Sequence, residues 1–117
     1  MEVQSAEQLV SKKCVACSGG VDRYPLPLVK QQLDVLPGWR LTNDDQRIRK
    51  DWSKSHFVEC LAFFEAVGKI AEQQAHHPDL HLESYRQVWI EIWTHDIGGL
   101  SENDFILAAK IDALDAG

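Results

Sequence analysis

Three histidines stand where a chain commonly builds a reactive site. His76 and His77 follow a long segment of helical periodicity and precede Pro78, and His95 ends a run of alternating residues. Side chains at the ends of elements, next to loops, are often functional, and imidazole exchanges protons near neutral pH. Because adjacent residues point in different directions, we expect one ring of the pair to face a cleft while the other braces it or reaches it from another angle. The pattern indicates a histidine acid/base site.

Each of these residues also has a structural interpretation, which the pattern alone leaves open. A histidine pair at a helix end can cap carbonyls as a cation, and His95 can bond to nearby backbone. Asp104 lies where a capping-box carboxylate belongs. His56 and His81 have no supporting context and are expected to be non-catalytic surface residues. Three histidines can also bind zinc, but two adjacent ones are poorly spaced for chelation, so we expect no metal and no cofactor.

The three cysteines of the chain do not define a site. Cys14 and Cys17 form a lone CxxC pair, and Cys60 lies far from them in the sequence. One pair supplies two of the four ligands that structural zinc requires, and no strand precedes the pair as in a thioredoxin-like motif. Structural, metal-binding and redox interpretations therefore stay open.

Charge and composition exclude several classes of partner. The net charge is −6 over 117 residues, which argues against nucleic acid and against an anionic membrane surface. No apolar run is long enough to span a bilayer, and the first residues are acidic and polar, unlike a secretory or transit leader. We expect a cytoplasmic protein of one domain.

Hydrophobic periodicity places these residues on a regular framework. A short amphipathic helix is expected at 26–36, followed by a hairpin with strands near 39–43 and 46–53. Ser55 can cap a helix of about five turns that ends by Ala75, because Pro78 disfavours helical geometry before it. A second hairpin, with residues 86–94 as its clearest strand, and a last helix after the capping box complete the chain.

The resulting order is α-β-β-α-β-β-α, which predicts an α+β fold with an antiparallel sheet and helices on one face. Residues 1–25 form an N-terminal arm with the CxxC, and residues 26–117 form the domain. Val88, Ile90 and Ile92 should point to the core. Trp89 and Trp93 share the opposite face, which we expect to be covered, by another subunit for example.

Several segments together resemble the pterin-4a-carbinolamine dehydratase family. The matching residues are Ala71-Glu72, His76-His77-Pro78-Asp79, Trp93-Thr94-His95, Gly98-Gly99 and the segment from Leu100 to Asp112. Gly38-Trp39 before a hairpin and a Cys-x-x-Cys arm ending in Gly-Gly are similar as well. The resemblance covers essentially residues 13–115. The segment between Pro78 and Val88 differs in length and detail from animal members.

The resemblance implies a four-stranded sheet, a homodimer or homotetramer, and a reaction. That reaction is loss of water from a 4a-hydroxytetrahydropterin to give quinonoid dihydropterin, which is recycled for aromatic amino acid hydroxylases. It implies that His76 and His95 are the acid/base pair and that His77 binds the 4a-hydroxyl. Asp104 would assist His95 or order the site. Glu72 and Pro78 are expected to contact the substrate.

Two rival functions follow from the same residues. Relatives in this family include a transcriptional coactivator and carboxylase assembly factors, which act through protein surfaces. A zinc-dependent hydrolase would use the three histidines as ligands. The retained histidine set favours the enzyme over the binding role, and the spacing disfavours zinc.

Overall fold

The protein is described by a computed structural model that covers residues 1–16 and 21–115. Cys17 and the Gly19-Gly20 pair lie outside the described residues, so the interpretation of the CxxC motif and of that loop is not tested. Of the described helices, none is both long and apolar enough to cross a bilayer.

Four antiparallel strands form one sheet. They are β1 (Arg40–Thr42), β2 (Arg47–Ser53), β3 (Asp79–Glu83) and β4 (Gln87–Ile92), arranged in the order β1-β2-β4-β3. Each hairpin contributes one central and one edge strand, and the two central strands pair from Ile48 opposite Ile92 to Ser53 opposite Gln87. Both predicted hairpins are confirmed, and they place the end of β4, and therefore His95, at one end of the sheet.

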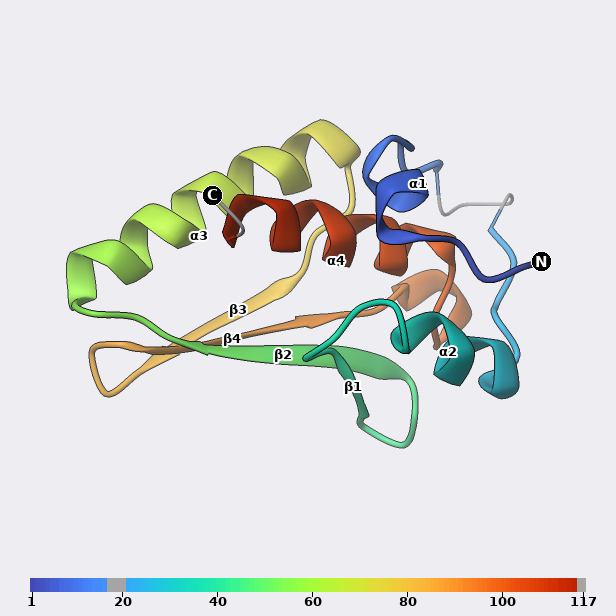
Figure 1. Cartoon of the computed structure of the whole chain (residues 1–117), viewed down its shortest axis with the longest axis horizontal. Helices are drawn as coiled ribbons and strands as arrows, with labels where there is room; N and C mark the ends of the chain where they lie inside the picture. The colour runs from blue at the N-terminus through green and yellow to red at the C-terminus, as the bar shows by residue number, and fades with distance from the viewer. Residues whose placement is uncertain (17–20, 116–117) are drawn as a thin grey trace.

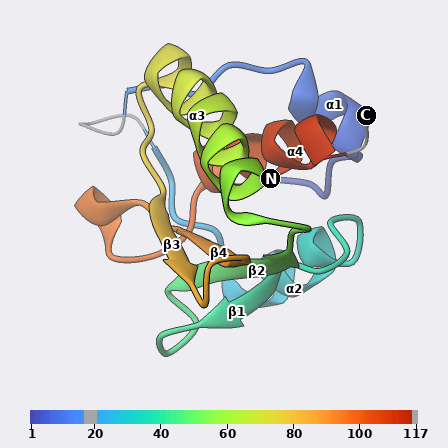
Figure 2. The same ribbon diagram turned by 90° about the vertical axis from the view of Figure 1, so that its left-hand side faces the viewer.

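Helices cover one face of this sheet, as predicted. The long helix α3 (Phe57–Gln74) and the last helix α4 (Glu102–Asp115) lie side by side over it, whereas α2 (Leu26–Leu33) lies apart from that layer (Figures 1 and 2). Two short elements complete the order: α1 (Ala6–Val10), where the sequence at residues 7–10 allows a short helical turn, and an unpredicted 3-10 turn (His95–Ile97).

The start of α3 differs from the prediction in one detail. The N-cap is His56, whose side chain accepts a hydrogen bond from the backbone N–H of Glu59, and not Ser55. Ser55 instead donates its own backbone N–H to the Glu59 carboxylate. Imidazole nitrogen can serve as the acceptor that the first turn needs, so His56 has a structural role on the surface.

The helix α4 is apolar on nearly all sides because the core surrounds it. Every residue from Phe105 to Ala109 is buried, which is typical of a helix enclosed by other elements. The sheet, with Ile90 and Ile92 fully buried, lies below it, and Leu9 of α1, also fully buried, belongs to the same core. The N-terminal arm therefore packs against α4 (Figure 1), and this packing holds the start of α4 in position.

The outer face of the sheet is partly covered by the chain's own cations. The Arg49 guanidinium lies 4.6 Å from the Trp89 ring centroid and that of Arg47 lies 4.2 Å from the Trp93 centroid. The His81 ring also stacks on Trp89, with the two ring centroids 4.8 Å apart. Stacking of this kind lowers the exposed apolar area. Both tryptophans are half-buried without a second subunit.

The arm also contacts α4 through an ion pair between Lys12 and Glu102. We expect this contact to weaken in acid. Burial would raise the pKa of Glu102, but hydrogen bonds from Lys12 and Gln4 and the charge of Lys12 lower it overall. A carboxylate whose pKa is lowered on folding stabilises the protein at any pH above its pKa in the unfolded chain, which is about 4.3. This stabilisation is lost as the pH falls through the pKa of the folded state. We expect the stability difference between wild type and Glu102→Gln, measured by urea unfolding, to shrink from pH 6 to pH 3. A constant difference would contradict this role.

Candidate active site

The end of α3 separates the two adjacent histidines. Ala75 adopts a left-handed conformation with φ of 53°, and the backbone N–H of His76 donates to the carbonyl of Ala71 at 3.2 Å. This is the turn by which many helices end. His76 then lies inside the protein, 6% exposed, whereas His77 is on the surface. The expectation that the two rings point differently is confirmed.

His76 is held by a buried carboxylate from the other helix. Its Nε2 lies 2.7 Å from Oδ1 of Asp104, which is fully buried. Because a carboxylate accepts hydrogen bonds, Nε2 carries the proton and donates it to Asp104. In the neutral ring Nδ1 then holds the lone pair. The contact joins residues 28 positions apart, at the end of α3 and the start of α4.

The second oxygen of Asp104 is bound equally well. Oδ2 accepts the hydroxyl of Thr94 at 2.7 Å and the backbone N–H of Ser101 at 2.8 Å. Since Thr94 gives its one hydroxyl hydrogen to Asp104, the Ser101 hydroxyl donates to Thr94 Oγ1, 2.8 Å away. All three side chains are buried. Asp104 therefore caps its helix through Ser101 and orders the site at the same time.

Asp104 is bonded to a different histidine from the one that the resemblance suggests. Of the two expected roles, assisting His95 or ordering the site, the first has no contact behind it, because among the described residues the carboxylate's hydrogen bonds go to His76, Thr94 and Ser101. His95 is exposed and lies instead against Trp93, with ring centroids 3.8 Å apart. Thr94 between them is fully buried, whereas Trp93 is half-buried and His95 is exposed.

His77 has a carboxylate partner of its own. Its Nε2 is hydrogen-bonded to Oε2 of Glu72, one turn earlier on α3, and both side chains are largely exposed. An exposed pair of this kind contributes little to stability. The hydrogen bond orients the His77 ring, and it places Glu72 beside the predicted site. Pro78 follows and is half-buried.

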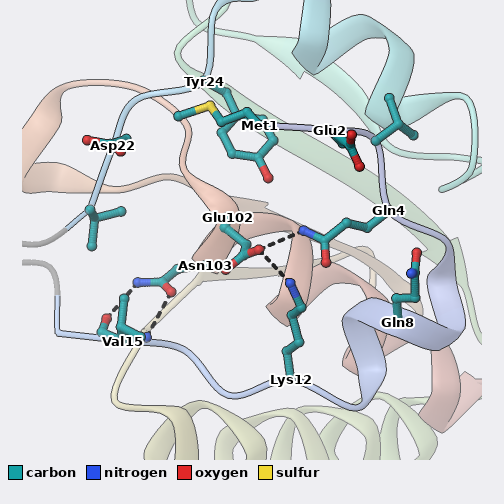
Figure 3. Close-up of a pocket in the computed structure, with 12 residues that line it drawn as sticks. Met1, Glu2, Gln4, Gln8, Lys12, Val15, Asp22, Tyr24, Glu102 and Asn103 are labelled. Carbon is teal, nitrogen blue, oxygen red and sulfur yellow. Dashed lines mark hydrogen bonds and ion pairs between the residues drawn. The ribbon is translucent and has the colours of Figure 1, made fainter.

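One pocket brings the three histidines together. It has a volume of about 250 Å³ and is lined by Ala75, His76, His77, Trp93, His95 and Asp96. A larger pocket of about 480 Å³ lies between the arm and the start of α4, where no histidine lines it (Figure 3). We place the candidate site in the smaller pocket because, of these two, it alone is lined by histidines, which come from the end of α3 and the segment after β4.

Two features of the site were not predicted. Thr94 and Ser101 had no assigned role beyond the motifs that contain them, yet both belong to the buried hydrogen-bond network. The signal was present for Thr94: it continues the inward-facing series Val88, Ile90 and Ile92, and a hydroxyl on an apolar face needs a partner. Trp93 as a wall of the pocket had no such signal.

No metal is needed to explain this arrangement. The described residues contain no cluster of three or more His, Cys, Asp or Glu side chains placed to hold an ion. The zinc hydrolase interpretation therefore gains no support from the part of the chain that the structure describes. The geometry provides three imidazoles in one pocket, and a buried carboxylate holds one of them, His76, which suits proton transfer.

The structure gives a small α+β fold with a pocket lined by three histidines, and the comparisons give the family. Residues 25–114 match the family model of pterin 4 alpha carbinolamine dehydratase. The chain belongs to this family, whose enzymes are hydro-lyases.

Individual relatives agree with that membership. The chain is 47% identical over 113 residues to pterin-4-alpha-carbinolamine dehydratase 2, mitochondrial, of Arabidopsis thaliana; this covers 94% of the chain and 60% of the relative. A Dechloromonas aromatica protein that bears the same dehydratase name is 41% identical, over 91% of the chain and 92% of its own length. The chain thus spans less than two thirds of the plant protein and nearly all of the bacterial one.

A solved structure supports the fold. The chain is similar to the transcriptional coactivator/pterin dehydratase from Brucella melitensis, with a TM-score of 0.74 and 25% identity. The likeness covers 80% of this chain and 98% of that one. The four-stranded sheet and the helices over it are therefore those of the family.

Proposed function

We propose that the protein dehydrates 4a-hydroxytetrahydropterin, pterin-4a-carbinolamine, to quinonoid dihydropterin by histidine general acid/base catalysis. The observation that carries this is the pocket in which His76, His77 and His95 meet, in a chain of the dehydratase family. The reaction breaks the bond between C4a and its hydroxyl and removes the proton on N5. One donor and one acceptor of protons therefore suffice, and the products are water and the dihydropterin.

The dyad of His76 and Asp104 suits the acceptor. Asp104 holds the Nε2 proton of the ring, so Nδ1 is the nitrogen with a lone pair. The carboxylate also stabilises the imidazolium that forms once Nδ1 has taken the N5 proton, as a buried orienting carboxylate does in other histidine enzymes. We assign His76 as the base.

His95 suits the donor of the departing hydroxyl's proton. It lines the same pocket as His76, at the start of the 3-10 turn that follows β4, and it lies against the ring of Trp93. Because it is exposed, the water that leaves can exchange with solvent there, and the ring can regain a proton. His77, oriented by Glu72, would bind the 4a-hydroxyl, and Glu72 and Pro78 would contact the substrate.

The experiment is a dehydration assay with freshly prepared 4a-hydroxytetrahydropterin, followed by the absorbance of quinonoid dihydropterin. Purified protein should raise the rate well above the spontaneous one, and treatment with a chelator should leave the rate unchanged. Loss of activity with chelator, restored by zinc, would favour the hydrolase-type metal site. A rate equal to the spontaneous one would favour a protein-binding role like that in the name of the Brucella protein.

The cellular setting is proposed on the same basis. The product would be recycled for a pterin-dependent aromatic amino acid hydroxylase. The protein would act in the cytoplasm. It would form a homodimer or homotetramer in which each domain of residues 26–117 is preceded by its N-terminal arm. Exposed apolar side chains on α3, such as Phe57 and Val58, support association. Light scattering of the purified protein tests it, and a monomer would contradict it. Cell fractionation tests the location, since the Arabidopsis relative is named as mitochondrial.

A further inference from the structure

The N-terminal arm is bound directly to the residue beside Asp104. Val15 donates its backbone N–H to Oδ1 of Asn103 at 3.0 Å, and its carbonyl accepts from Nδ2 of the same side chain at 2.8 Å (Figure 3). Asn103 is 1% exposed. Both ends of a buried amide are thus satisfied by one residue of the arm, which fixes the start of α4 against it.

The preceding residue of the arm is bound to the end of α3. Cys14 donates its backbone N–H to Oε1 of Gln74 at 2.8 Å, and its thiol lies 3.6 Å from the carbonyl of Asn103. Gln74 is the last residue of α3, two positions before His76. Two consecutive residues of the arm therefore connect the same two helix ends that the His76–Asp104 hydrogen bond connects.

This connection matters because His76 follows a helix end and is not part of a regular element. Its ring reaches Asp104 across the gap between α3 and α4, and a relative shift of those ends would lengthen the 2.7 Å contact. Misplacement of a catalytic group by about 1 Å can reduce the rate by about 10²-fold. Preorganised groups are usually held by neighbours that do not touch the substrate.

We propose that Asn103 and Gln74 are positioning residues that hold the His76–Asp104 pair in register through residues 14 and 15 of the arm. The proposal rests on the proposed function, since it assigns these residues to the same reaction. Neither residue lines the histidine pocket, so each acts through His76 and Asp104. Substrate binding by His77 and Glu72 should be unaffected.

The test is a double-mutant cycle. Asn103→Ala and Gln74→Ala are each made in the wild type and in Asp104→Asn, and kcat and KM for 4a-hydroxytetrahydropterin are measured. In the wild type we expect kcat to fall by about 10-fold to 100-fold with little change in KM. In Asp104→Asn, where the pair is already broken, each change should lower kcat by less than about twofold, since coupled residues are not additive.

A matched control lies on the same arm and the same helix. Lys110 donates to the carbonyl of Val10 at 2.7 Å, so Lys110→Ala loosens the arm away from His76, and its kcat should equal that of wild type. Should Asn103→Ala fail to fold, the half-buried Gln74 decides the question with the same cycle. Equal losses in both backgrounds, or no loss in the wild type, would overturn the proposal. The proposed function would remain intact as long as His76→Ala still reduces kcat.

Discussion

Replacement of His76 by alanine should lower kcat for dehydration by about 10²-fold to 10⁴-fold, the usual worth of a positioned acid or base. The change removes the imidazole that we propose as acceptor of the N5 proton, and Asp104 loses one of its buried hydrogen-bond partners. KM should change much less, because the pterin is held mainly by other residues of the pocket. Steady-state kinetics on purified variants measure both values.

The matched control for this prediction is His81→Ala. His81 lies on the outer face of the sheet, stacked on Trp89, and it does not line the histidine pocket. Its replacement should leave kcat within about twofold of wild type. If the two variants lose activity equally, or if neither loses any, His76 is not the base.

Asp104→Ala should cost both stability and activity. The change leaves the His76 ring, the Thr94 hydroxyl and the Ser101 N–H without their buried acceptor, and a single unsatisfied buried group costs about 1–3 kcal/mol. Removing one partner of a buried charged network typically costs about 3–5 kcal/mol in total. We expect a loss of that order in the free energy of unfolding, measured with urea.

Two further variants separate the roles of Asp104. Asp104→Asn keeps the size of the side chain and one oxygen acceptor. If that oxygen continues to accept from Thr94 and Ser101, the amide nitrogen is left beside His76, and it cannot accept the hydrogen bond that Nε2 of His76 donates. It should therefore lose most activity and less stability than the alanine variant. Glu102→Gln, at a half-buried carboxylate two positions earlier in the chain, should lose less than about 1 kcal/mol. An Asp104→Ala protein as stable as Glu102→Gln would refute the buried network.

Most of the framework follows from local signals in the sequence. The apolar stripe of α3 and the alternation in β4 are strong patterns, and Pro78 marks where the long helix must end. The antiparallel hairpins follow from turn residues between short strands. These elements place His76 and His95 at element ends, so a candidate histidine site could be predicted from the sequence.

The connections within the site could not be predicted in this way. Asp104 binds His76 across two helix ends that the sequence separates by 28 positions, and the capping motif around Ser101 would look the same without that contact. The attachment of Val15 to Asn103 is likewise a tertiary contact of an irregular segment, for which no periodicity exists. The family resemblance supplied the residues of the site, and only the structure paired them.

The most direct test compares the wild type with a His76→Ala/His95→Ala double variant in the dehydration assay, with the spontaneous reaction as the baseline. Both imidazoles of the proposed acid/base pair are then absent, while the pocket residue His77 and its partner Glu72 remain. Circular dichroism of both proteins verifies that the fold is kept. We expect clear acceleration by the wild type and a rate near baseline for the double variant. Equal rates for the two proteins would contradict it.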